Sequence, residues 1–123
     1  MIPRLRPFGM SILLFVCLCP ARAQEYGPTL LKDIYPGVSS SAPTYLTDVN
    51  GTLFFIADDG TYGVEVWKSD GTAAGTAMVK DINPGAGGSF PFDFTNVNGT
   101  LFFTATDGTR RQRSATVCPL KAG

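Results

Sequence analysis

Carboxylates in tight turns are the residues of this 123-residue chain that could most directly do chemistry. Asp59, Asp70 and Asp107 each begin an Asp-Gly-Thr triplet. Carboxylate oxygens are ligands that Ca²⁺ takes in proteins, so a calcium site is one interpretation. The spacing of an EF-hand loop or a Gly-rich nonapeptide loop is absent, however, and Asp before Gly is also what a tight turn requires without a metal. We therefore expect structural turns and no cofactor, with Ca²⁺ at these three Asp residues as the alternative.

Catalytic residue types are few in this sequence. The chain contains no His, which excludes a Ser–His–Asp triad and every metal site that needs imidazole. Asp59 and Glu65 could in principle form the acid pair of a glycosidase. The turn Asp recurs as Asp107, however, which favours architecture over a unique active site. The Gly/Ser stretch at 85–89 lacks the G-x-x-x-x-G-K-[ST] pattern of a phosphate loop, so the sequence predicts no enzyme.

Two groups of side chains could contact a ligand. Trp67 with Tyr45 and Tyr62 could stack on a sugar, although a Trp in a strand more often belongs to the core. Residues 110–113 form a basic cluster that could contact phosphate, but residues 24–109 carry three Lys against ten acidic residues, which opposes nucleic-acid binding. The expected partners are further repeats, other copies of the chain, or an extracellular protein or carbohydrate, and no nucleic acid.

The N-terminal segment has the three-part layout of a secretory signal peptide. Arg4 and Arg6 precede an apolar run at residues 11–19, which is shorter than the roughly 20 residues of a membrane-spanning helix. A small-residue pattern follows at 21–23. We predict that residues 1–23 are removed on export and that no transmembrane segment remains. A buried N-terminal helix is the alternative.

The cysteines are consistent with this prediction. Cys17 would be the lipidated residue of a lipoprotein signal, but Val16 stands where such signals have a small residue. A mature chain beginning at Gln24 loses Cys17 and Cys19 and keeps only Cys118, so it forms no internal disulfide. We expect a secreted or cell-surface protein whose stability comes from packing.

The mature sequence contains a repeat with a period of 48 residues. Residues 32–37 recur as 80–85 and residues 49–55 recur as 97–103, with no gap between the two matches. Over the 31-residue window that starts at Leu31, 19 positions are identical. Self-similarity at a period of 20–50 residues is typical of stacked supersecondary units, either propeller blades or a solenoid.

Each unit is predicted to contain four short strands joined by turns. The Asn50-Gly51 pair is the strongest short-range hairpin signal. We expect strands near 29–34, 45–49, 53–58, 64–69, 77–82, 94–97 and 101–106. Residues 53–57 are apolar on both strand faces, so the sheet needs cover on both sides, which neighbouring propeller blades supply. The predicted fold is all-β, with β-propeller-blade-like four-stranded antiparallel units in an incomplete array. A β-solenoid is the alternative.

Residues 65–72 resemble the E-L-W-x-x-D-G-T repeat of bacterial exported proteins, also labelled hyalin-like, with Val66 where that repeat usually has Leu. Residues 79–82 and 98–103 are similar to further parts of the same pattern. The resemblance covers roughly residues 27–109. It implies a secreted or cell-surface repeat protein that is propeller-like and has no established catalytic activity.

The repeat pattern stops after Thr109. Residues 110–123 hold four basic residues and no acid, and the expected Glu-Leu-Trp strand is missing. We therefore divide the chain into a signal peptide at 1–23, two repeat units at 24–109 with the second partial, and a basic tail at 110–123. We expect the tail to be loosely attached, as a frameshift or a truncated reading frame would produce.

The predicted function is an exported non-enzymatic β-repeat module for binding or surface assembly. The alternatives are a truncated fragment of a larger exported enzyme or adhesin with β-propeller repeats, and a pseudogene product without function.

Overall fold

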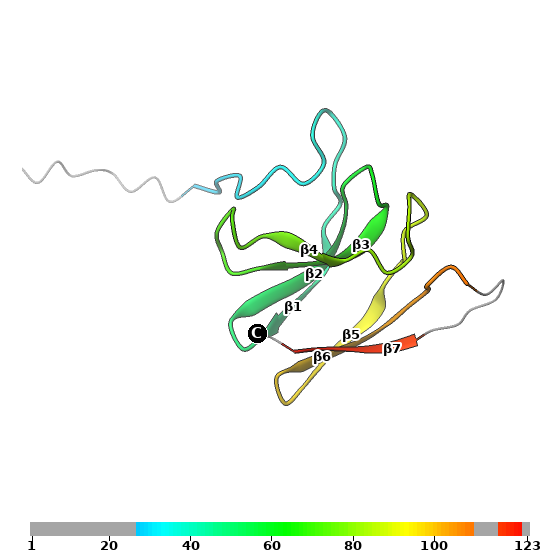
Figure 1. The fold of residues 1–123 in the computed structure, drawn as a ribbon. Helices are drawn as coiled ribbons and strands as arrows, with labels where there is room; N and C mark the ends of the chain where they lie inside the picture. Colours follow the sequence, from blue (N-terminus) through cyan, green and yellow to red (C-terminus); the bar gives the residue numbers. More distant parts are fainter. Residues whose placement is uncertain (1–26, 110–115, 122–123) are drawn as a thin grey trace, which may run out of the picture.

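The structure is a computed structural model that describes residues 27–109 and 116–121. These residues form seven strands and no helix, so the predicted all-β class is confirmed. The strands are β1 (Thr44–Val49), β2 (Thr52–Asp58), β3 (Val64–Ser69), β4 (Ala77–Lys80), β5 (Phe92–Val97), β6 (Thr100–Ala105) and β7 (Thr116–Lys121). They make two antiparallel sheets, ordered β1-β2-β3-β4 and β5-β6-β7, and neither sheet closes on itself (Figure 1).

The β1–β2 and β5–β6 hairpins turn at the two Asn-Gly pairs, as the sequence predicts. The pair at 50–51 has φ values of 53° and 82°, and the pair at 98–99 has 51° and 79°. Asn and Gly enter this left-handed region more readily than other residues, which is why the pair closes a two-residue hairpin. Asp48 Oδ1 and Asn96 Oδ1 each accept a hydrogen bond from the amide of the turn glycine, at 3.0 Å in both hairpins.

The geometry of the first hairpin recurs 48 residues later in the second. The pairs beside the bulge are Thr44↔Ile56 and Thr47↔Phe54 in the first sheet, and Phe92↔Thr104 and Thr95↔Phe102 in the second. Tyr45 and Asp93 lie within the two bulges and have almost the same positive φ, 56° and 58°. The two sheets are therefore built alike over their first two strands.

Residues 29–34 form no strand, and the prediction there is wrong. The segment 48 residues later contains β4, which pairs with β3. Within the described residues no strand comes before β1, so residues 29–34 have no counterpart of β3 to share hydrogen bonds with. An extended segment without a partner strand is not stable as a strand. The segment lies instead beside the first sheet, where Ile34 packs against the cluster of Phe55, Ala57 and Trp67.

The C-terminal segment supplies a strand that the sequence did not predict. β7 pairs with β6, so the expectation of a loosely attached tail is wrong for residues 116–121. The remainder of the tail, at 110–115 and 122–123, lies outside the described residues. Backbone hydrogen bonds hold a strand and need no particular motif, so residues without the repeat pattern can take this position. Pro119 is tolerated there because β7 lies at the edge of its sheet.

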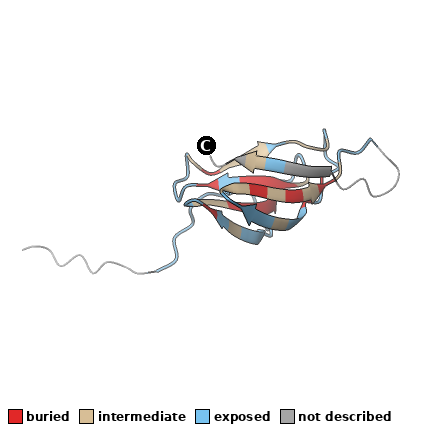
Figure 2. Cartoon of the chain, turned by 90° about the horizontal axis from the view of Figure 1, so that it is seen from below, coloured by how far each residue is buried: buried red, intermediate tan, exposed pale blue. Residues whose placement is uncertain are grey.

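The buried apolar residues form two clusters, of which only the larger joins the two sheets. The larger joins Val49, Phe54 and Val66 of the first sheet to Leu101, Phe103 and Ala105 of the second. The smaller consists of Phe55, Ala57 and Trp67. Phe54 and Phe55 belong to different clusters because successive strand residues point to opposite faces. Buried residues gather in the strands, whereas the connections and residues 27–33 are largely exposed (Figure 2).

Candidate functional site

The three turn aspartates each bind their own turn. Asp59 Oδ1 accepts hydrogen bonds from the amides of Thr61 and Tyr62, at 2.9 and 2.8 Å. Asp70 Oδ1 accepts from the amide and hydroxyl of Thr72 at 2.9 and 2.7 Å, and Asp107 Oδ1 accepts from the amide and hydroxyl of Thr109 at 3.0 and 2.7 Å. The described residues contain no group of three or more His, Cys, Asp or Glu side chains that could hold a metal. The carboxylates thus act on the backbone that follows them.

The acid pair considered for a glycosidase does not face an open cleft. Glu65 has no exposed surface, and its Oε2 accepts hydrogen bonds from Ser89 Oγ at 2.5 Å and from the Ile82 amide at 3.3 Å. Its Oε1 has no hydrogen-bond partner among the described residues. Burial raises the pKa of Glu65, and the hydrogen bonds from Ser89 and Ile82 act against that rise. Through these hydrogen bonds, the carboxyl group links β3 to the connection between β4 and β5.

The aromatic side chains considered for sugar stacking do not form one exposed surface. Trp67 is buried in the cluster with Phe55 and Ala57. Tyr62 is exposed in the connection between β2 and β3, and Tyr45 packs against Phe94 with ring centroids 5.9 Å apart. The Trp that would supply most of the stacking area is therefore part of the core.

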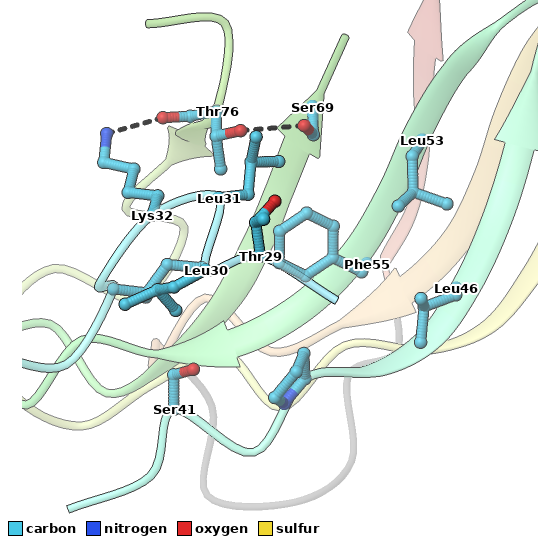
Figure 3. Close-up of a pocket in the computed structure, with 12 residues that line it drawn as sticks. Thr29, Leu30, Leu31, Lys32, Ser41, Leu46, Leu53, Phe55, Ser69 and Thr76 are labelled. Atoms are coloured by element: carbon cyan, nitrogen blue, oxygen red, sulfur yellow. Dashed lines mark hydrogen bonds between the residues drawn. The ribbon is translucent and has the colours of Figure 1, made fainter. Parts of the chain in front are cut away.

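An apolar pocket of about 310 Å³ lies on the first sheet, on the side that bears Phe55 (Figure 3). Its floor consists of Leu46, Leu53 and Phe55 from β1 and β2, and we call these three residues the front face of the first sheet. Residues 29–32 form part of its wall. Composition and motif spacing gave no sign of this pocket, because its wall comes from a segment distant in sequence from β2.

The polar groups at one end of the pocket are satisfied by each other (Figure 3). Thr76 Oγ1 donates to the Thr72 carbonyl at 2.7 Å and lies 2.7 Å from Ser69 Oγ, so the Ser69 hydroxyl donates to Thr76. Lys32 Nζ donates to the Thr76 carbonyl at 2.6 Å. Among the described residues no acid–base pair lines the pocket, and its free surface is mainly apolar. It can accept apolar groups and offers no nucleophile activated by a base.

Within the described part of the chain, no helix is long and apolar enough to cross a membrane. No protein-family model, curated protein or solved structure matches the sequence or the fold of this chain.

Proposed function

We propose that this protein is an exported, non-enzymatic β-repeat module that offers its sheet surfaces for binding or surface assembly. Its sheets stack like successive blades of a propeller, in an array that is left incomplete. The observation that carries the proposal is the packing of two similarly built sheets face to face, with an apolar pocket on the outer side of the first.

The chemistry of the described residues supports a surface role over a catalytic one. The turn carboxylates are used by their own turns, and the only fully buried carboxylate, within the described residues, is tied to Ser89 and Ile82. The pocket is lined mainly by apolar atoms. Apolar surface that stays open on a folded chain is typical of interaction sites.

Sedimentation velocity of the exported, purified chain tests the assembly role. We expect the sedimentation coefficient to rise with protein concentration without any added partner, because the open apolar surface is covered on association. A chain that remains a monomer at the highest concentration would contradict assembly as its function.

A further inference from the structure

The internal interface shows which surfaces of these sheets fit each other. Val49 and Phe54 form what we call the back face of the first sheet. They pack against Leu101 and Phe103 of the second sheet, with Phe94 beside them. Those three residues stand 48 positions after Leu46, Leu53 and Phe55, so they are the front face of the second sheet. Within the chain, the back face of the first sheet therefore packs against the front face of the second sheet.

The front face of the first sheet lacks the cover that its counterpart has. Leu101 has no exposed surface, whereas the equivalent Leu53 is only half-buried and Leu46 is 63% exposed. Ile34 packs beside Phe55, and Ile82, 48 residues later, packs beside the cluster that contains Phe103. The neighbouring segment is thus present at both sheets. The pocket lies on this front face, on which no back face packs among the described residues.

The back face of the second sheet is more exposed to solvent than the back face of the first sheet. Val49 is 0% exposed, and the equivalent Val97 is 47% exposed. Phe54 is buried, whereas the equivalent Phe102 is half-buried, and Phe92 on the same face is exposed. The same Val-Asn-Gly-Thr-Leu-Phe-Phe sequence builds both back faces. Burial differs because a sheet covers one back face and, among the described residues, none covers the other.

We propose that a second copy of this chain fills the pocket: the back face of its second sheet packs on the front face of the first sheet of its neighbour. This inference rests on the proposed function and specifies its partner and its direction. The two faces that meet are copies of the two faces that already pack together within one chain. The contact joins two different surfaces, so it is head-to-tail, and repeated addition gives a ring if the rotation closes and a filament if it does not.

The internal interface also predicts which residues meet between copies. Tyr45 of the first sheet lies against Phe94 of the second, with ring centroids 5.9 Å apart. The equivalents of these two residues are Asp93 and Leu46, so Asp93 of one copy is expected beside Leu46 of the next. A Cβ atom added at Gly99 would come within 2.4 Å of the Asn50 side chain, whereas one added at the equivalent Gly51 would meet nothing within 4 Å. Gly51 therefore has the open space into which Asn98 of a neighbour would fit.

Cross-linking between two single-cysteine variants tests the direction of association. Leu46→Cys and Asp93→Cys are made in a Cys118→Ser background, which a thermal melt first shows to be folded. The exported products, which are expected to begin at Gln24 and to lack Cys17 and Cys19, are mixed and treated with a short bismaleimide. We expect a cross-linked dimer from the mixture, none from either variant alone, and none from the background protein. A mixture of Leu46→Cys with Tyr62→Cys is the matched control, because Tyr62 is exposed and lies outside both faces.

The outcomes separate this inference from the proposed function. Cross-linking of Leu46→Cys with itself, as strong as in the mixture, would show that two front faces meet and would overturn the head-to-tail contact. Association in the centrifuge with no more cross-linking in the mixture than in the control would place assembly at another surface, which also overturns it while the proposed function stands. No association at any concentration would contradict both this inference and the assembly role in the proposed function.

Point variants give a second readout that does not depend on cross-linking. Leu46→Glu and Val97→Glu each place a charge on one open face, outside the residues that form the internal interface. We expect each to raise the dissociation constant of self-association at least tenfold, and we expect Tyr62→Glu to leave it within twofold. Unchanged association in both face variants would overturn the proposal.

Discussion

Asn96 and Asp48 are joined across the two sheets: Asn96 Nδ2 donates a hydrogen bond to the Asp48 carbonyl at 3.1 Å. The two residues occupy equivalent positions, 48 residues apart, near the ends of β5 and β1. A contact between equivalent positions means that the second sheet lies on the first with corresponding strands side by side. Such packing can be extended by repetition. The back face of one sheet packs on the front face of the next sheet, and the back face of that next sheet can receive a further front face in the same way.

Val49→Ala and Val97→Ala form a matched pair that measures what the internal interface contributes. Val49 is fully buried, so its truncation is expected to cost about 2 kcal/mol of unfolding free energy through lost apolar burial and a residual cavity. Val97→Ala is expected to cost less than about 0.5 kcal/mol, as exposed substitutions do. Urea denaturation at low protein concentration measures both. Equal costs would show that the two back faces are covered alike.

Glu65→Gln is expected to flatten the pH dependence of stability. Burial raises the folded-state pKa of Glu65 above the ordinary value of 4.5, so the folded state binds this proton more tightly than the unfolded state. The stability gained from the protonated form is fully present below pH 4.5 and is lost as the pH rises through the folded-state pKa. The wild-type chain should therefore lose stability across that window, whereas the Gln variant, which can still accept from Ser89 and Ile82, should not.

Thermal melts in buffers on both sides of this window measure the effect. Asp70→Asn serves as the control. Hydrogen bonds from Thr72 hold the pKa of Asp70 below its usual range. The stability that the ionised Asp70 contributes is therefore lost as the pH falls, which is the opposite of the pH dependence expected for Glu65. An identical pH profile for Glu65→Gln and the wild type would show that Glu65 does not titrate differently on folding.

Gly63→Ala is expected to destabilise the fold more than Gly71→Ala. Both glycines have positive φ, 74° and 90°, so both variants carry backbone strain of about 1 kcal/mol. Only at Gly63 would the added Cβ lie 2.6 Å from the Gly88 backbone nitrogen, whereas at Gly71 it meets nothing within 4 Å. Circular dichroism melts of the two variants compare them. Equal losses would show that the connection at Gly88 does not pass closely over β3 in solution.

A chelator is expected to leave the melting temperature unchanged. Asp59, Asp70 and Asp107 each bind amides of their own turns through one carboxylate oxygen, which stabilises the turn without an ion. Melts with and without EDTA, and with added CaCl₂, measure this. A large fall in melting temperature with EDTA, restored by calcium, would instead identify these residues as metal ligands. Asp70→Ala, which loses the acceptor for Thr72, should melt lower than wild type in either buffer.

Sequence alone predicted the strands that belong to hairpins. The Asn-Gly and Asp-Gly turns and the apolar residues beside them place β1 to β6 within two residues of their observed bounds. This works because a hairpin is local: the turn residues set the reversal, and the register follows from the turn. The apolar character of both faces at 53–57 also indicated a sheet that is covered on two sides.

Tertiary structure decided the features that depend on a distant partner. Residues 29–34 and β4 have similar sequences, yet only β4 is a strand, because a strand needs a neighbour for its backbone hydrogen bonds. The converse holds for β7, which pairs with β6 although it lacks the repeat motif. Val49 and Val97 share a sequence and a register, and only the presence of an opposing sheet makes one buried and the other exposed. Local sequence therefore indicated the hairpin strands, whereas the remaining pairing and the burial were set by what lies across from each segment in space.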